Sequence, residues 1–425
     1  MNNTSQATSV NPSIVVIGGG PAGMMAAYTA AAKGINVTLL EKNEKLGKKL
    51  HITGKGRCNL TNNTDITGLM SNVISNPRFL YSAFNAFDSQ ALMALFEGIA
   101  PLKTERGGRV FPASDKANDI NLALRGLLKT AGVGVELNCP VLDISYCNVF
   151  FAITRKVTHQ ANAIIIATGG LSYPSTGSTG DGYTFAKELG HGIIPTVPSL
   201  VPLTAEEPWI PALEGLSLRN VKCKVTAPKK GKKVLYEEIG EMLFTNKGIT
   251  GPLILSASAY IAGMSDALVT IDLKPGLTPD QLDIRLLRDF ETHKNKDFCN
   301  ALDGLLPQRL IETIVRLSQI PPDTKVHTIT RNQRQSLVHL LKNLEIRPTG
   351  NHGYKEAVIT KGGVSTKEVS PSTLMSKHIP GLFFAGEVLD VDALTGGYNM
   401  QIAFSTGHLA GLSAAKFLQR EQINE

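Results

Sequence analysis

Three glycines near the start of the chain have the spacing of a phosphate-binding turn. Gly18, Gly20 and Gly23 stand in the stretch GGGPAG, which follows the apolar run IVVI at 14–17 and precedes an alanine-rich stretch. In a strand–turn–helix unit, the first glycine allows the tight turn, the second lets the backbone approach a pyrophosphate, and the third lets helix and strand pack closely. The helix N-terminus then offers free N–H groups to the phosphates. The pattern predicts a dinucleotide site.

An acidic residue stands where the ribose of such a nucleotide is usually held. Glu41 directly follows the stretch NVTLL at 36–40, which is typical of the second strand of the unit. A carboxylate at this strand end accepts hydrogen bonds from the adenosine ribose hydroxyls and disfavours a 2′-phosphate. The sequence therefore favours an adenosine ribose that carries no 2′-phosphate.

Basic residues gather in the loop that follows. Residues 42–57 include six lysines and arginines and a single acid. The dipeptide Gly-Lys at 54–55 suggests a P-loop, but that motif needs Gly at position 49 and Ser or Thr at position 56. The chain has Lys49 and Gly56 there, so the P-loop interpretation fails. We expect Lys48 and Lys49 near the pyrophosphate.

Two elements far downstream favour FAD over NAD. The first is NAIIIATGG at 162–170, a buried strand that ends in small residues, and the second is GLFFAGEVLDVDALTGGYNMQIAFSTG at 381–407. FAD extends beyond the first unit through its ribitol and isoalloxazine, whereas NAD needs no further loops. Glu387 is placed to hydrogen-bond ribitol hydroxyls. A helix that starts near Asn399 would direct its positive end at the flavin N1 and C2 carbonyl.

The sequence holds no dedicated nicotinamide domain. The nearest candidate, TGSTGDGY at 176–183, has the spacing G-x-x-G-x-G and indicates the start of a helix instead. NAD(P)H would therefore act as a transient electron donor without a Rossmann unit of its own.

Composition limits the class of protein. The 425 residues are too many for one core and predict two or three domains. No run approaches the roughly 18 apolar residues of a membrane helix. Residues 1–12, expected to be a disordered tail, lack both the basic and the apolar part of a secretory signal. Five widely spaced cysteines without a C-x-x-C pair indicate reduced thiols in a cytoplasmic protein, and no metal site.

The middle of the chain changes character and is expected to be an insert. VKCKVTA at 221–227 and ALVTIDL at 267–273 alternate apolar and polar residues, which predicts half-buried antiparallel strands of a small barrel or sandwich. The expected division is a FAD-binding domain at 13–195, an inserted β-rich domain at 196–277, a helical subdomain at 278–345, and a return to the β domain and the FAD-binding domain at 346–425.

Capping boxes mark two helix starts in this helical part. They lie at 278–281 (TPDQ) and 330–333 (TRNQ), where a threonine is followed three residues later by glutamine. Helices are predicted at about 279–293, 307–318 and 331–343.

Six longer stretches carry a resemblance to a known family. They are GGGPAG, LLEKNEKLGKKLHITGKGRCNLTN, ATGGLSYPSTGSTGDGY, PSLVPL, EMLFTNKGITGPLIL and GLFFAGEVLDVDALTGGYNMQIAFSTG. Together they resemble the BaiN/YhiN-type family of bacterial FAD-dependent oxidoreductases, over about residues 13 to 415. Members have been described as aminoacetone oxidases and as reductases of bile-acid intermediates. The resemblance implies an α/β fold with a Rossmann-type, glutathione-reductase-like FAD-binding domain, an inserted β-barrel-like domain and a small helical subdomain.

The resemblance also implies a set of FAD contacts. Several of them fall on the loop at 53–59, where Gly54 and Gly56 let the backbone pass close to the cofactor. The implied contacts are Gly18, Gly20, Pro21, Ala22, Gly23, Glu41, Lys42, Lys48, Lys49, Thr53, Gly54, Gly56, Arg57, Cys58, Asn59, Val141, Ala167, Thr168, Gly169, Gly386, Glu387, Gly397, Tyr398, Asn399 and Met400.

The sequence does not assign a catalytic base. Polar side chains that could stand near a flavin ring are those of His51, Arg57, Cys58, Tyr173, Lys247, His352, Tyr354 and Tyr398. Cys58 has no neighbouring cysteine in the sequence and is interpreted as a packed thiol rather than a redox centre. Tyr398, His352 and Lys247 remain as catalytic candidates.

Three functions remain open at this point. The leading one is an FAD-dependent oxidoreductase that acts on a small organic substrate, either by NAD(P)H-dependent reduction or by oxidation with O₂. The alternatives are a flavin-dependent tRNA-modifying protein, motivated by the net charge of +7, and a non-catalytic flavin-binding protein. The basic residues are scattered outside the loop at 42–57, which argues against a nucleic-acid partner. We expect a monomer or a homodimer.

Overall fold

The computed structural model describes residues 13–54, 56–227 and 233–424, so the tail expected at 1–12 lies outside the described residues. The chain folds into two compact units. One combines Met1–Val197 with Val358–Glu425, and the other is Pro198–Ala357. The first unit is therefore built from both ends of the chain, and the second is an insertion.

A parallel sheet forms the centre of the first unit. Its order is β21-β11-β1-β2-β7, and every neighbouring pair is parallel. A parallel sheet brings the carboxyl ends of its strands to one edge, where nucleotides bind in such folds. The strands are β1 (Ser13–Ile17), β2 (Asn36–Leu40), β7 (Gly134–Glu136), β11 (Ala163–Ile166) and β21 (Leu382–Phe384).

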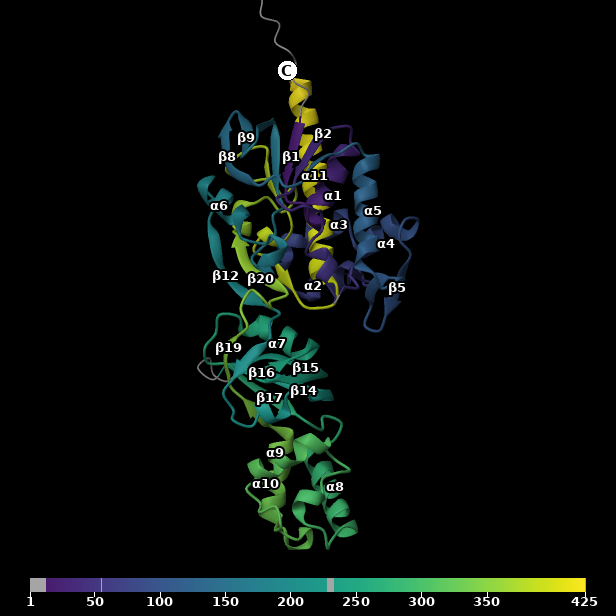
Figure 1. The fold of residues 1–425 in the computed structure, drawn as a ribbon, viewed down its shortest axis with the longest axis vertical. Coiled ribbons are helices and arrows are strands. Elements are labelled where there is room, and N and C mark those ends of the chain that lie inside the picture. Colours follow the sequence, from purple (N-terminus) through teal and green to yellow (C-terminus); the bar gives the residue numbers. More distant parts are fainter. Residues whose placement is uncertain (1–12, 55, 228–232, 425) are drawn as a thin grey trace, which may run out of the picture. The chain divides into compact units, whose positions relative to one another are not determined.

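Two helices from opposite ends of the chain pack together beside this sheet. They are α1 (Pro21–Ala31) and α11 (Tyr398–Asn424), which Figure 1 shows side by side next to β1. A Cβ atom on Gly407 or Gly411 would lie less than 3.0 Å from a backbone oxygen of α1. Glycine at these two positions thus lets the helices approach closely.

Smaller elements complete the first unit. The three-stranded antiparallel sheet β10-β9-β8 packs beside β1 and β11 of the parallel sheet. Its strands are β8 (Val141–Cys147), β9 (Val149–Thr154) and β10 (Thr158–Ala161). The other strands are β3 (Thr61–Asn62), β4 (Val73–Ser75), β5 (Leu102–Glu105), β6 (Arg109–Pro112), β12 (Ile193–Ser199), β20 (Ile359–Val364) and β22 (Asp392–Ala393). The remaining helices are α2 (Ile66–Ser71), α3 (Tyr81–Ala86), α4 (Ser89–Glu97), α5 (Ala117–Thr130) and α6 (Asp181–Glu188).

The insert contains the antiparallel strands that the sequence predicts. They run in the order β18-β17-β14-β15-β16-β13-β19, and only Arg347 separates the two end strands β18 (Leu344–Ile346) and β19 (Pro348–Asn351) in the chain. The strands β18 and β19 are thus nearly one continuous strand. Because they form the two edges of the sheet, the sheet closes on itself like a barrel. The other strands are β13 (Leu203–Ala205), β14 (Ser217–Ala227), β15 (Lys233–Thr245), β16 (Gly248–Thr250) and β17 (Leu268–Asp272), with the helix α7 (Pro252–Ile261).

Three helices follow, as expected. They are α8 (Pro279–Thr292), α9 (Gln308–Ser318) and α10 (Arg331–Lys342), and Figure 1 shows them gathered in one group. Both predicted capping boxes form: Thr278 and Thr330 each accept from the backbone N–H three residues on, and the glutamine there bonds back to the threonine N–H. The buried leucines Leu282, Leu310 and Leu337 belong to the core of this unit.

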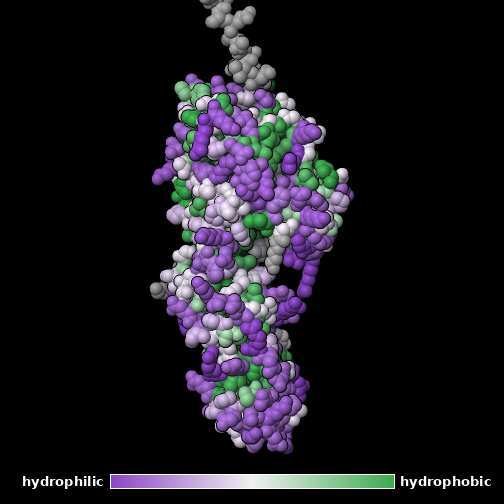
Figure 2. Space-filling view, in the orientation of Figure 1, coloured by the Kyte–Doolittle hydropathy of each residue, from purple (hydrophilic) through white to green (hydrophobic). Residues whose placement is uncertain are grey.

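The surface shown in Figure 2 is mainly hydrophilic, with hydrophobic residues in separate patches. None of the helices in the described part of the chain combines the length and apolar character that a membrane crossing requires.

Candidate functional site

The turn after β1 has the geometry that its glycines predict. Gly18 has a φ of +108°, and a Cβ atom there or on Gly23 would lie less than 3.0 Å from a backbone oxygen. At Gly20, by contrast, a Cβ atom would meet nothing within 4 Å. The first N–H groups of a helix have no partner within the helix, and no side chain caps α1. The turn therefore presents open space and free donors at Gly20, as an anion site requires.

Glu41 is held rigidly at the end of β2. Its carboxylate accepts hydrogen bonds from the N–H of Gly19 at 2.7 Å and from the N–H of Asn43 at 2.7 Å. The Asn43 side chain donates to the same carboxylate and to the Thr176 carbonyl at 3.1 Å. A buried carboxylate with these donors is fixed in orientation, and its remaining lone pairs can accept from a ligand hydroxyl.

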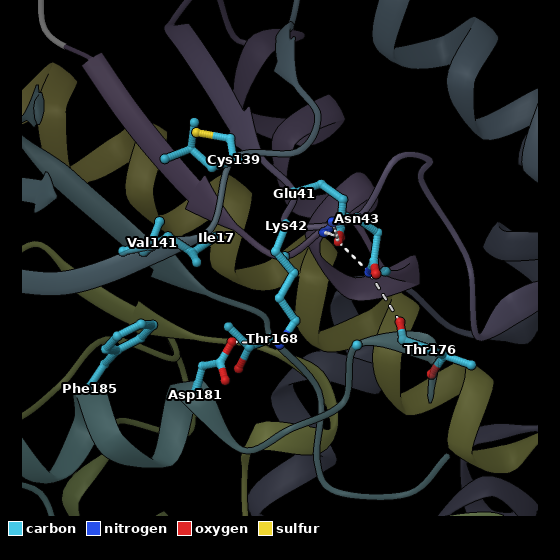
Figure 3. A pocket seen from close by; sticks show the side chains of 15 residues that line it. Ile17, Glu41, Lys42, Asn43, Cys139, Val141, Thr168, Thr176, Asp181 and Phe185 are labelled. Carbon is cyan, nitrogen blue, oxygen red and sulfur yellow. Dashed lines mark hydrogen bonds and ion pairs between the residues drawn. The ribbon is translucent and has the colours of Figure 1, made fainter. Parts of the chain in front are cut away.

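A cavity of about 440 Å³, here called the turn cavity, opens beside Glu41 (Figure 3). Lys42 reaches across it to an ion pair of 2.7 Å with Asp181 at the start of α6. Thr168 also lines it, and its Oγ1 is buried without a hydrogen-bond partner among the described residues. The lining residues are Ile17, Gly18, Gly19, Gly20, Leu40, Glu41, Lys42, Asn43, Cys139, Val141, Thr168, Thr176, Gly177, Asp181 and Phe185.

A second cavity of about 760 Å³, here called the α11 cavity, lies on the other side of Gly20. Gly20 lines both cavities, so the two meet at the turn after β1. Most of the side chains that line the α11 cavity are apolar. The lining residues are Gly20, Pro21, Ala22, Lys49, Leu50, Thr53, Ala167, Gly169, Val358, Ile359, Ala385, Glu387, Val391, Asn399, Met400, Ile402 and Ala403.

One ion pair stands in the wall of the α11 cavity. Lys49 Nζ lies 2.7 Å from Glu387 Oε2, and the other carboxylate oxygen accepts from the N–H of Thr360 at 2.7 Å. About three quarters of each charged side chain is shielded from solvent, since 24% of Lys49 and 22% of Glu387 is exposed. The pair joins residues far apart in sequence and places two charged groups in an otherwise apolar cavity.

The N-terminus of α11 points at the same cavity and is held by two loops. Asn399 donates to the Ala393 carbonyl at 2.8 Å and accepts from the Ala393 N–H at 3.0 Å. Asn59, with its amide oriented to satisfy its neighbours, accepts from the Gly397 N–H at 3.0 Å. The first N–H groups of a helix lack partners within the helix, so α11 brings free donors and partial positive charge to the cavity.

The structure brings fifteen of the expected cofactor contacts to these two cavities. Six line the turn cavity and ten line the α11 cavity, with Gly20 in both. Ten others line neither: Gly23, Lys48, Gly54, Gly56, Arg57, Cys58, Asn59, Gly386, Gly397 and Tyr398.

Several of those ten have other partners. Lys48 pairs with Glu44 at 3.3 Å. Arg57 pairs with Glu105 and with Asp115, and its guanidinium lies 4.1 Å from the centre of the Phe111 ring. These basic side chains of the loop at 42–57 are therefore neutralised by neighbouring acids rather than directed into a cavity.

Cys58 is a packed thiol. Its side chain is fully buried, and burial raises the pKa of the thiol to about 12. All five cysteines are free. A thiol that stays protonated and inaccessible is not a nucleophile.

The three catalytic candidates are divided between the units. Tyr398 begins α11, next to the Asn399 and Met400 of the α11 cavity, and burial raises the pKa of its phenol. Lys247 and His352 belong to the insert, where Lys247 is exposed between β15 and β16 and His352 lies 2.9 Å from the Glu356 carboxylate. Among the three, Tyr398 alone belongs to the unit that contains both cavities.

Some lining residues carried no signal in the sequence. Asp181 and Phe185 lie on α6, whose start TGSTGDGY was interpreted only as a helix start. Val358, Ile359 and Val391 are ordinary apolar residues that reach the α11 cavity through tertiary packing.

A family model that describes the HI0933-like protein Rossmann domain matches residues 12–413. The chain belongs to the HI0933-like family. This match covers nearly the whole sequence, including the insert, and it agrees with the resemblance that the motifs indicate.

Two relatives of the HI0933-like chain match over almost their whole length. One is the ribosomal RNA dihydrouridine synthase of Escherichia coli, 33% identical over 92% of this chain and 95% of the relative. The other is the 3-dehydro-bile acid delta(4,6)-reductase of Clostridium scindens, 33% identical over 95% of this chain and 99% of the relative.

A solved structure shares the fold. The 3-ketosteroid-Δ4-(5α)-dehydrogenase of Rhodococcus jostii RHA1 gives a TM-score of 0.50 at 15% identity, over 97% of this chain and 99% of that one. The HI0933-like chain is therefore an oxidoreductase with a flavoprotein fold, and its family implies FAD. The open turn at Gly20, the unpartnered Thr168 hydroxyl and the two joined cavities fit such a cofactor.

Proposed function

We propose that this protein is an FAD-dependent reductase that saturates a carbon–carbon double bond conjugated with a carbonyl group. The observation that carries the proposal is the pair of cavities joined at Gly20, one of mixed lining with a buried carboxylate and one mainly apolar. The names of the two relatives point to the same chemistry. Formation of dihydrouridine saturates the uracil ring next to a carbonyl, and delta(4,6)-reduction saturates double bonds conjugated with a 3-oxo group.

FAD would be held along both cavities. Gly18–Gly20 and the N-terminus of α1 would meet the pyrophosphate, and Glu41 would accept from the adenosine ribose. Glu387 and Lys49 would face the ribitol, and the N-terminus of α11 would face the ring. When bound, FAD supplies two-electron hydride chemistry.

The residues of the α11 cavity provide the surroundings for that chemistry. Its apolar lining keeps water away from the reacting atoms, which strengthens every electrostatic interaction inside. The free N–H groups of α11 stabilise negative charge that develops near its first turn. Tyr398, the first residue of α11 and the neighbour of Asn399 in this cavity, carries a phenol that is protonated at neutral pH, and it is the proton donor that we propose from this unit.

The electron donor in this proposal is NADH or NADPH, bound transiently. The sequence has no second G-x-G-x-x-G after a strand, which is consistent with a donor that reaches the flavin, transfers its hydride and leaves.

A uridine of ribosomal RNA is the second candidate substrate, beside a small conjugated enone. Two relatives that match over at least 95% of their own length, from Escherichia coli and Haemophilus influenzae, carry the name ribosomal RNA dihydrouridine synthase. The net charge of +7 would favour a polyanion at low salt. A small-molecule substrate needs only the α11 cavity, whereas an RNA substrate also needs a surface that binds phosphates.

One experiment separates these possibilities. The purified protein is reduced anaerobically with NADPH or NADH. It is then mixed with a steroid dienone, with the corresponding saturated ketone as a control, or with ribosomal RNA from cells that lack the gene for this protein. We expect flavin reoxidation by an unsaturated acceptor and none by the saturated ketone. Mass spectrometry of the RNA then identifies dihydrouridine, if uridine is the substrate. Reoxidation by O₂ alone, with every unsaturated acceptor inert, would contradict the proposed reaction.

A further inference from the structure

Three side chains with metal-binding atoms meet at the edge of the parallel sheet. Glu136 ends β7, Cys139 lies in the next loop, and His159 lies on β10. One carboxylate oxygen, the sulfur and one ring nitrogen all lie within 4.8 Å of one another. Glu136 Oε2 is 3.6 Å from His159 Nε2 and 3.7 Å from Cys139 Sγ. This is the one such group of three found among the described residues.

The backbone holds all three residues in place. The Cys139 N–H donates to the Glu41 carbonyl at 2.9 Å, and the Glu41 N–H donates to the Glu136 carbonyl at 2.9 Å. His159 pairs with Ala152 in the ladder between β10 and β9. Glu136 and His159 therefore lie on strands, and a backbone hydrogen bond to the end of β2 holds the loop residue Cys139.

One atom of the group lacks a hydrogen bond among the described residues. His159 Nε2 is buried and makes no hydrogen bond within the part of the chain that the structure describes, although it faces the Glu136 carboxylate. A buried polar atom without a partner is uncommon and destabilising in proteins. The nitrogen lies 3.6 Å from the Glu136 carboxylate, which lies 3.7 Å from the Cys139 sulfur, so the space among the three atoms is the place a metal ion would occupy.

The chemistry of the three ligands selects the metal. Thiolate and imidazole ligands favour zinc over calcium or magnesium, which take oxygen ligands. The ligand atoms of a tetrahedral zinc site lie about 3.3–3.7 Å apart, given Zn–S of about 2.3 Å and Zn–N of about 2.0 Å. The two separations of 3.6 Å and 3.7 Å agree with that spacing. Glu136 is exposed, so the fourth position opens to water.

We propose that Glu136, Cys139 and His159 bind a zinc ion, with water as the fourth ligand. Zinc binds Cys139 as the thiolate, and the thiol proton is released to solvent. The sequence predicted no metal site, because the three ligands lack any known zinc spacing and His159 comes from another sheet.

The site adjoins the turn cavity. Cys139 lines that cavity, and Figure 3 shows its sulfur turned away from Lys42 and Asp181. Zinc would link β7 to β10 and hold the loop between β7 and β8, which leads into Val141 of the same cavity. The ion is thus a structural support of the cavity wall, and it has no role in the redox step.

Metal analysis of the full-length protein tests this inference. The protein is purified with its flavin and without chelators, dialysed against zinc sulfate, desalted and measured by mass spectrometry of the metal. We expect one zinc per chain in the wild type and a loss of at least tenfold in affinity in Cys139→Ser and in His159→Gln, measured by competition with a chromogenic chelator. Cys147→Ser, which alters an exposed free thiol on β8, and His327→Gln in the insert should keep wild-type zinc.

Cobalt provides a second readout. Cobalt bound in place of zinc through a thiolate should give visible bands at longer wavelength than the flavin, and Cys139→Ser should remove them. Wild-type protein that binds zinc no more tightly than Cys139→Ser and His159→Gln, or that holds none after desalting, would overturn the inference. Neither measurement depends on flavin reduction, so the proposed reaction could fail while this site stands.

Discussion

The turn cavity and the α11 cavity meet at Gly20 but are built in different ways. Eight of the fifteen residues that line the turn cavity lie between Ile17 and Asn43, around a buried carboxylate, and its walls combine backbone, polar side chains and a few apolar ones. The α11 cavity collects apolar side chains from both ends of the chain, and its one ion pair joins residues 338 positions apart. A local motif thus fixes one end of the site, and tertiary packing fixes the other.

The largest loss of folding stability is expected from a substitution at a glycine of the turn after β1. Gly23→Val places side-chain atoms against the Gly18 carbonyl, which cannot move away, and we expect a loss of about 3 kcal/mol in the free energy of unfolding. Thermal unfolding measures it. Gly20→Ala is the matched control, because its Cβ atom would meet nothing within 4 Å. That variant should fold like the wild type and retain less FAD.

Loss of the buried carboxylate should come next. Glu41→Ala removes the acceptor for the N–H groups of Gly19 and Asn43 and also the proposed ribose contact. We expect FAD to bind about 30-fold more weakly, which corresponds to about 2 kcal/mol. Fluorescence titration of the apoprotein gives the dissociation constant. FMN has no adenosine, so its affinity should not change, and an equal loss for FMN and FAD would contradict the assignment of the turn cavity.

The ion pair of the α11 cavity should show coupling of intermediate size. Lys49→Met and Glu387→Gln each leave one partner of a mostly shielded pair alone. A double-mutant cycle on FAD affinity should give a coupling energy of about 1 kcal/mol. Additive effects of the two substitutions would show that Lys49 and Glu387 do not act together in the site.

The loop at 53–59 reaches the α11 cavity through Thr53, and substitutions in it test whether the loop supports the site. Gly56 has a φ of +85°, a conformation that a β-branched residue rarely adopts, while a Cβ atom would meet only the His51 carbonyl at 3.8 Å. Gly56→Val should therefore lower FAD retention several-fold through backbone strain of about 1–3 kcal/mol. Lys45→Ala should lower it less. Wild-type retention in both variants would mean that the loop does not support the site.

The last expected effect is confined to alkaline pH, where stability should depend on pH. Burial raises the pKa of Cys58 in the first unit and of Cys223 in the insert from 9.0 to about 12. Both thiols ionise in the unfolded chain above about pH 9 but stay protonated in the folded one, so stability falls as pH rises from 9 toward 12. Cys58→Ala should reduce that slope by about 1.4 kcal/mol per pH unit. An unchanged slope, measured by urea unfolding, would contradict the burial of this thiol.

Much of this architecture is readable from local sequence. The turn at Gly18–Gly23, the helix that starts at Tyr398 and both capping boxes depend on residues within a few positions of one another, and the structure contains all of them. The barrel-like closure also follows the predicted strands. Each of these features has a cause in backbone conformation or in a short side-chain hydrogen bond.

The rest depends on contacts between distant residues. The basic loop at 42–57 suggested phosphate binding, yet Arg57 pairs with Glu105 and Asp115, whose positions the sequence does not reveal. Asp181, which pairs with Lys42, and His159, which meets Cys139, were equally hidden. A cluster of basic residues in a sequence predicts an anion-binding site only when the positions of the neighbouring acidic residues are also known.

The central claim is that a single FAD spans both cavities, and fragment binding tests it most directly. Calorimetric titration of the apoprotein with FAD, FMN and ADP should show each fragment binding at least about 100-fold more weakly than FAD, because each fills one cavity only. Wild-type protein that binds FMN as tightly as FAD would contradict the claim, since the turn cavity would then contribute nothing.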